Sequence, residues 1–188
     1  MKTIKNITIL ALTVITLMSC GGSSKQEANA EGFRNIEKEI KNKFGEDAYF
    51  TKISIMHDES IGNMISLTVT EAPESFKMEE WNLSQNSWKQ SSELTLEVPE
   101  GTKASDYMFQ LDDKINLAKL GELTEKSKKQ LTDEKDLKNP SLYIAFINFP
   151  KDGDISKADY NINLKPQHGG TTFRFNYALN GDLIKMDY

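Results

Sequence analysis

The fold is decided by residues 33–55, which read FRNIEKEIKNKFGEDAYFTKISI. In the first half of this stretch, apolar residues recur at spacings of three and four, at Phe33, Ile36, Ile40 and Phe44. On a helix of about 3.6 residues per turn this spacing makes one apolar stripe, with the charged residues on the opposite face. Gly45 follows at a position where helices commonly end. The pattern predicts a helix over residues 31–44.

A run of extended segments follows this helix. β-branched and aromatic residues that alternate with polar ones are typical of half-buried strands. That pattern marks four segments, residues 49–55, 65–70, 76–83 and 88–98. The short polar connection at residues 84–87 predicts a hairpin between the last two segments. Because connections of this length join antiparallel neighbours, we expect an antiparallel sheet.

The same order of elements then begins again. Leucines gather on one side of a helical wheel, at Leu117, Leu120, Leu123 and Leu131. They predict a helix over residues 117–133, with Asn116 as its N-cap and Gly121 as a weak point. Four more strands are expected, at residues 142–149, 157–165, 171–179 and 183–188. The predicted fold class is α+β.

The two halves read as a tandem repeat of similar units, each a helix followed by an antiparallel meander. Two stretches of the first half match stretches of the second, 49–58 with 143–152 and 81–89 with 177–185. We therefore expect a first unit at residues 33–100 and a second at residues 101–188, sharing a core or a sheet. Few identities support the match, so a coincidence of two common α+β patterns stays open.

The chain ends in a hairpin motif, FRFNYALNGDLI, over residues 173–184. An aromatic strand leads into Asn-Gly-Asp, of which Asn-Gly favours a tight type I′ turn, and an aliphatic strand follows. A helix followed by an antiparallel meander with this final hairpin resembles the PepSY-type and cystatin-like α+β modules of bacterial envelope proteins. The resemblance implies a binding or inhibitory role rather than catalysis, and it assigns no functional residue in this chain.

The N-terminus has the composition of an export signal. Lys2 and Lys5 precede residues 7–18, an apolar run interrupted only by threonine. A membrane-spanning helix needs about 20 apolar residues, so the run has instead the length of a signal-peptide core. The sequence Leu17-Met18-Ser19-Cys20 then resembles the lipobox of bacterial lipoproteins. The resemblance implies cleavage before Cys20 and attachment of lipid, palmitate included, to its sulfur.

These residues predict that the protein is located in the cell envelope. Residues 1–19 are expected to form a lipoprotein signal peptide, although a plain secretory signal followed by a spare cysteine stays open. Residues 20–32 are mostly small or polar, a composition typical of flexible linkers, and are expected to tether the folded body. The membrane contacted through the lipid on Cys20 would be the outer membrane, with the body on its periplasmic or surface side.

Composition argues against several classes of function. The chain has 23 basic and 28 acidic residues, whereas nucleic-acid binding needs a basic surplus. One cysteine excludes a disulfide framework and cysteine-cluster metal sites. His57 and His168 lie far apart in sequence and are predicted to be loop residues rather than metal ligands. No phosphate-binding loop, dinucleotide-binding glycine motif or serine nucleophile elbow is present, so we expect no cofactor, no metal and no enzymatic activity.

Three aromatic residues are the remaining candidates for a binding site. Trp81 and Trp88 flank a predicted hairpin, and Tyr177 stands at the matching place in the second unit. Such rings can stack against a sugar or a partner protein, or they can pack across strands into the core. The sequence favours a lipid-anchored module that binds an envelope protein, peptide or polymer. An envelope hydrolase that uses paired carboxylates and a purely structural lipoprotein are the alternatives.

Overall fold

A computed structural model describes residues 22–166 and 170–187; the predicted signal peptide, Cys20 and His168 lie outside the described residues. Two helices, α1 (Ala30–Phe44) and α2 (Leu117–Lys135), confirm the helices predicted from leucine, isoleucine and phenylalanine spacing. The strands are β1 (Tyr49–Asp58), β2 (Gly62–Thr70), β3 (Lys77–Ser84), β4 (Ser87–Thr95), β5 (Ser141–Asn148), β6 (Asp159–Lys165), β7 (Phe173–Ala178) and β8 (Leu183–Asp187). Short 3₁₀ turns are η1 (Ser23–Lys25), η2 (Pro73–Ser75), η3 (Ala104–Tyr107) and η4 (Ile155–Lys157).

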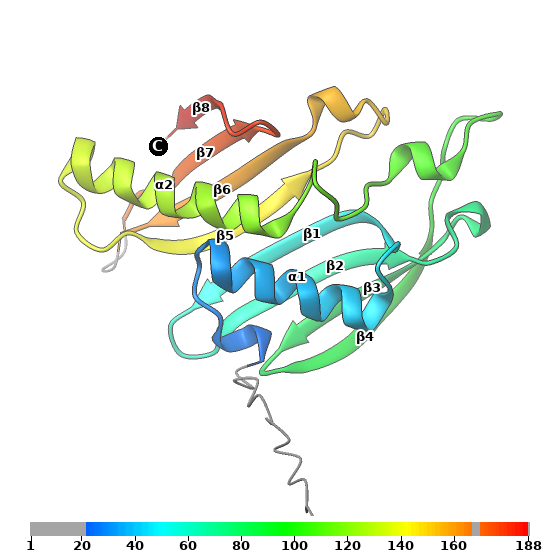
Figure 1. Cartoon of the computed structure of the whole chain (residues 1–188), viewed down its shortest axis with the longest axis horizontal. Helices are drawn as coiled ribbons and strands as arrows, with labels where there is room; N and C mark the ends of the chain where they lie inside the picture. The colour runs from blue at the N-terminus through cyan, green and yellow to red at the C-terminus, as the bar shows by residue number, and fades with distance from the viewer. Residues whose placement is uncertain (1–21, 167–169, 188) are drawn as a thin grey trace, which may run out of the picture.

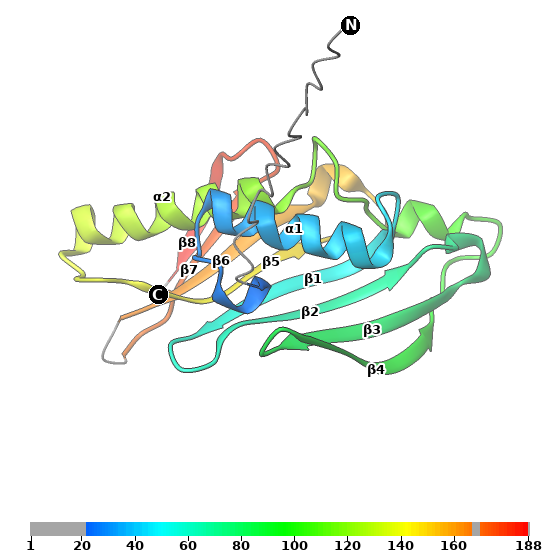
Figure 2. The same cartoon turned by 60° about the horizontal axis from the view of Figure 1, so that its bottom comes forward.

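All eight strands form one antiparallel sheet in the order β4-β3-β2-β1-β5-β6-β7-β8 (Figure 1). The first strand of each half lies at the centre, where β1 pairs with β5 and Ile53 stands opposite Ile147. Both helices cover the same face of the sheet and lie side by side (Figure 2). The opposite face carries no α-helix in the part of the chain that the structure describes. The predicted α+β class with an antiparallel sheet is therefore confirmed.

The helix α1 forms as its sequence pattern predicts. The Asn29 side chain caps its first turn by accepting a hydrogen bond of 2.8 Å from the backbone N–H of Gly32. The four apolar residues of the stripe are all buried, at Phe33, Ile36, Ile40 and Phe44. They pack into one core with the inward-facing residues of the sheet.

The helix α2 confirms one detail of the prediction and adds a packing role for another residue. Asn116 is the N-cap, because its side chain accepts a hydrogen bond of 2.8 Å from the backbone N–H of Lys119. Gly121 keeps the low helix propensity of glycine, but it also lets α2 approach α1. A Cβ at this position would stand 2.2 Å from the backbone oxygen of Asn29, so any side chain there would clash with backbone at the start of α1. At this position the close approach of the two helices requires glycine, in spite of its low helix propensity.

Four strand pairs each contain a bulge, an irregularity at which one strand holds an extra residue. The bulges lie between Phe50 and Lys52 on β1, between Glu80 and Trp81 in the β3–β4 pair, between Leu142 and Ile144 on β5, and between Asn176 and Tyr177 in the β7–β8 pair. Each half of the sheet therefore has one bulge in its first hairpin and one in its second.

Two predictions about loops are wrong. Residues 22–29 do not form a flexible tether, because Ser23 and Ser24 are buried in η1 and Asn29 already caps α1. The small polar residues that suggested a flexible linker are equally suited to a segment that packs closely and forms hydrogen bonds. His57 lies within β1 rather than in a loop, because the pairing of β1 with β2 continues to Asp58. Within the described residues, neither helix is long and apolar enough to cross a membrane.

Candidate functional site

Trp81 and Trp88 are brought together, but they pack against α1. Trp81 on β3 and Trp88 on β4 both meet the ring of Phe44 edge to face, with ring centroids 5.5 Å and 5.3 Å away. The ammonium of Lys43 lies 4.2 Å from the centroid of the Trp81 ring. Both tryptophans are half-buried and close the end of the main core. This arrangement is cross-strand and helix packing rather than a flat stacking platform.

Tyr177 belongs to the core, which is one of the two roles that the sequence left open for it. It lies on β7, is fully buried, and its hydroxyl lies 2.8 Å from the hydroxyl of Ser127 on α2. Burial raises the pKa of Tyr177, while the bond to Ser127 acts in the opposite direction. The tyrosine packs beneath α2, whereas the two tryptophans pack against α1. The three predicted aromatic residues do not share one site.

A polar network that sequence reasoning missed fastens residues 22–29, here called the strap, to the folded body. The backbone N–H and the hydroxyl of Ser23 both donate to Oε2 of Glu39 on α1, over 3.1 Å and 2.5 Å. The indole N–H of Trp88 donates to the other oxygen of the same carboxylate over 2.9 Å. Glu39 therefore links the strap, α1 and β4, and Trp88 is part of this network.

Asn63 also holds the strap directly. Its side chain lies on β2 and is fully buried. Its amide nitrogen donates to the backbone oxygens of Ser23 and Gln26, over 3.0 Å and 2.7 Å. Its amide oxygen lies 2.8 Å from Nδ1 of His57. A buried asparagine with all of these partners is typical of a position that specifies one backbone path.

Two turns of the sheet complete the strap site. In the β3–β4 turn, the side-chain oxygen of Asn86 accepts hydrogen bonds from the hydroxyl and, over 3.2 Å, the backbone N–H of Ser24. At the start of β2, Gly62 has a φ of 84°, and a Cβ there would stand 2.1 Å from the backbone oxygen of Ser24. The strap thus fits a surface that has no room for a side chain at residue 62.

The open sheet face, opposite the helices, has an apolar centre. Four half-buried side chains adjoin across three strands and form what we call the central patch, made of Met56, Met64, Ile144 and Phe146. In the register, Met56 stands opposite both Met64 and Ile144. Asparagines adjoin this patch on β3 and β6, at Asn82, Asn161 and Asn163, and Asn176 on β7 stands beyond Asn161. The face can therefore offer apolar contact at its centre and amide donors and acceptors around it.

A cleft of about 760 Å³ opens at the end of β2, beside η2 and the adjoining ends of β3 and β4. Phe44 and Val69 contribute apolar walls, and Glu71, Glu79 and Glu93 bring carboxylates. Glu79 and Glu93 stand opposite each other across β3 and β4. Nowhere among the described residues do three His, Cys, Asp or Glu side chains gather closely enough to hold a metal ion.

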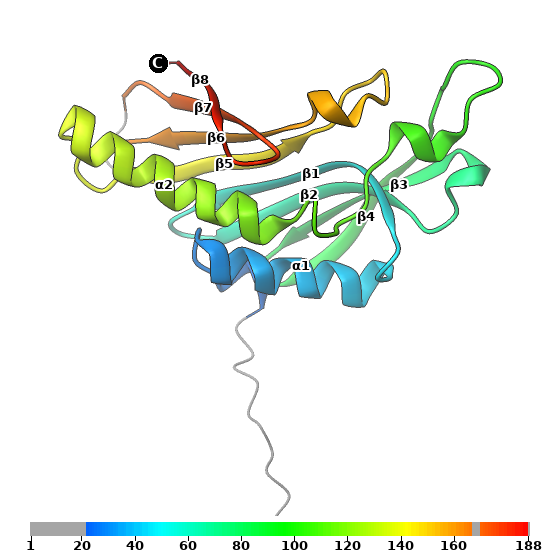
Figure 3. The same cartoon turned by 45° about the horizontal axis from the view of Figure 1, so that its top comes forward.

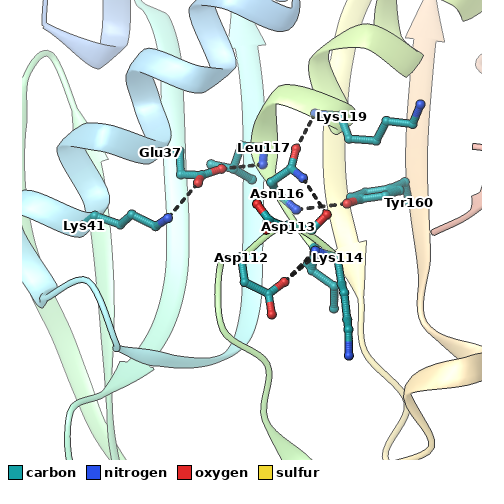
Figure 4. Close-up of polar contacts among 10 residues, drawn as sticks. Glu37, Lys41, Asp112, Asp113, Lys114, Asn116, Leu117, Lys119 and Tyr160 are labelled. Carbon is teal, nitrogen blue, oxygen red and sulfur yellow. Dashed lines mark hydrogen bonds and ion pairs between the residues drawn. The ribbon is translucent and has the colours of Figure 1, made fainter. Parts of the chain in front are cut away.

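A further polar cluster lies between the two helices (Figure 4). Glu37 on α1 accepts a hydrogen bond of 2.7 Å from the backbone N–H of Leu117, the first residue of α2, and pairs with Lys41 at 3.0 Å. The hydroxyl of Tyr160 on β6 accepts one of 3.0 Å from the backbone N–H of Asn116. Burial raises the pKa of Tyr160, and the bond from Asn116 opposes this shift. The cluster fixes the start of α2 against α1 and the sheet. Because its polar groups bond to one another in doing so, we assign it a structural role.

Asp159 on β6 is the carboxylate of the open face that burial affects. Burial raises its pKa, and hydrogen bonds from Asn148 and Asn161 partly offset the shift. Both hydrogen-bond partners are amides. A glycosidase-type mechanism needs a second carboxylate facing the first across the scissile bond. These contacts give Asp159 no such partner.

No family model, curated protein or solved structure matches this chain.

Proposed function

We propose that this protein is a lipid-anchored module of the bacterial cell envelope, and that it binds a partner protein through its open sheet face. The proposal of an anchor rests on the lipobox-like sequence that ends at Cys20, the one cysteine of the chain. The lipid would place the module at a membrane, facing the periplasm or the cell surface. Two or more acyl chains hold a protein at a bilayer firmly, whereas a single chain binds it only marginally.

The observation that carries the binding role is the central patch on the open sheet face. Met and aromatic side chains with few charges are typical of the centre of a protein interface. Phe146 and Ile144 are half-buried on a face that no described α-helix covers, and asparagines rather than lysines or glutamates stand beside them. A folded partner or an extended peptide could cover these side chains and bond to the amides. The envelope hydrolase has one observation in its favour, the Glu79–Glu93 pair beside the cleft. Both of these carboxylates are exposed, and we propose no enzymatic role.

We also propose that the two halves arose by duplication, which would explain why the same order of elements occurs twice. Each half runs from one helix into four strands, and the two first strands pair at the centre of the sheet. A bulge lies near the start of the first strand in both halves, after Phe50 and Leu142, two residues away from the sequence match, and another lies in both second hairpins, before Trp81 and Tyr177. Bulges need a specific insertion in one strand, so matching bulges support a shared origin more strongly than matching residue types do.

Site-specific photocrosslinking in cells tests the binding role. A photoreactive phenylalanine analogue at position 146 is expected to give a discrete adduct with an envelope protein. Phe76 is a matched control, because it is the same residue type, 37% exposed, and lies outside the patch. Adducts of equal yield from both positions, or none from position 146, would contradict the proposal.

The anchor is tested separately by metabolic labelling. We expect labelled palmitate on the wild-type chain and none on a Cys20→Ala variant, which should also leave the membrane fraction. A Cys20→Ala chain that fractionates like the wild type would refute lipid anchoring.

A further inference from the structure

The strap begins within a few residues of the predicted lipidation site, so little chain separates the lipid from the folded body. Ser23 and Ser24 are 2% and 3% exposed, and Gly22 precedes them directly. One residue, Gly21, stands between Cys20 and Gly22, and the two residue-to-residue steps that join them span at most about 7 Å even when fully extended. A flexible linker of about a dozen residues would instead average about 20 Å between its ends. The body therefore begins much closer to Cys20 than linker composition predicts.

The strap is attached at one end of the sheet. It contacts the start of β2 at Asn63 and the β3–β4 turn at Asn86. The β1–β2 turn, residues 59–61, adjoins the same end, because β1 and β2 meet there. The turn η4 lies at the opposite end of the strands, far from η1 in all three views (Figures 1, 2 and 3). The anchor point thus has a fixed place on the body.

We infer that this end of the molecule, made of the strap, residues 59–61 and residues 85–86, lies against the bilayer headgroups. The inference rests on the proposed lipidation of Cys20 and concerns the orientation that follows from it. The headgroup layer on each side of a bilayer is about 5–7 Å thick, so a reach of about 7 Å does not lift the body clear of it. The lipid bilayer is the occupant of this surface.

The orientation keeps the open sheet face available. Asn63 lies on the same side of the sheet as Ile65 and Leu67, whose side chains belong to the core beneath the helices. The strap therefore packs on the helix side, and the central patch is on the other side. The η4 turn and the cleft beside η2 point away from the membrane. A protein held in this way presents its binding face to partners in one direction instead of swinging on a linker.

Fluorescence quenching by labelled headgroups tests this orientation in the full lipidated chain. Ile61→Cys and Ile155→Cys give matched labelling sites, since both isoleucines are exposed, at 40% and 45%, and lie at opposite ends. The protein is placed in phosphatidylcholine vesicles that carry nitroxide on their headgroups. We expect a fluorophore at position 61 to be quenched several-fold more strongly than one at position 155.

A linker insertion supplies the control that leaves every packed residue unchanged. Ten Gly and Ser residues inserted between Gly21 and Gly22 should reduce quenching at position 61 to the level at position 155, while the protein still floats with the vesicles. Equal quenching at both positions in the vesicle-bound parent, or no response to the insertion, would overturn the orientation but leave the anchor intact. A chain that does not float with vesicles at all would overturn the anchor, and the orientation with it.

Discussion

Replacing Asn63 with alanine should release the strap and lower the free energy of unfolding substantially. The Asn63 amide makes two hydrogen bonds to strap carbonyls and one contact with His57. A hydrogen bond contributes about 1 kcal/mol net, and leaving buried partners unsatisfied adds to the loss. Because the side chain is fully buried, we expect a loss of about 2–4 kcal/mol. The lost interactions join the strap to the sheet, so the strap should also exchange its amide hydrogens faster.

The measurement is urea unfolding of the mature chain with Cys20→Ala, which avoids the lipid. Asn82→Ala is the matched control, because Asn82 is exposed on β3 and its side chain donates one hydrogen bond of 3.0 Å, to Ser91. Exposed substitutions of this kind usually change stability by less than about 0.5 kcal/mol. The two asparagine variants should therefore separate clearly.

A double-mutant cycle identifies the strap as the cause. In a chain that lacks residues 22–26, Asn63 has lost both of its strap partners, Ser23 and Gln26, so Asn63→Ala should cost much less than it does in the parent. A cost below about 0.5 kcal/mol in the parent would refute the reasoning. So would an equal cost in the parent and in the shortened chain, since the strap would then contribute nothing.

Three further changes can be measured by the same unfolding assay. Gly121→Ala should destabilise the protein by about 1–3 kcal/mol, because the added Cβ would clash with the backbone oxygen of Asn29. This clash should outweigh the gain in helix propensity of about 1 kcal/mol, and a stabilised variant would contradict the reasoning. Trp88→Phe should cost about 1–2 kcal/mol, since the bond to Glu39 is lost while the ring contact remains. Burial raises the pKa of Tyr160, so the Tyr160 hydroxyl loses its proton at a lower pH in the unfolded chain than in the folded one. The free energy of unfolding should therefore fall as pH rises above about 10, and Tyr160→Phe should reduce that fall.

The secondary structure could be predicted because its signals are local. The Phe33–Phe44 stripe and the alternation along each strand are set by the period of the backbone, so they are visible without any tertiary contact. The same is true of the Asn116 cap, which bonds to a residue three positions away. Short polar connections also identified the antiparallel pairing. These predictions agree with the structure to within a few residues at each end.

The candidate sites could not be predicted in the same way. Asn63 reads as one more polar residue of a strand, and its partners lie 40 and 37 residues away in sequence. Tyr177 was indistinguishable from an exposed aromatic residue, because burial depends on α2 packing over it. Gly121 carries a helix penalty in isolation, and its value comes from the backbone of another helix.

The sequence by itself determined the elements, their antiparallel order and the expectation of an anchored envelope protein, since periodicity, caps and motifs act over a few neighbouring residues. Tertiary structure decided which face of the sheet stays open and which polar groups meet. It also converted a segment with linker composition into a strap, because the strap donates hydrogen bonds to Glu39 and Asn86 and accepts them from Asn63, three residues in different parts of the fold. Those contacts form between residues far apart along the chain, so folding alone brings them together.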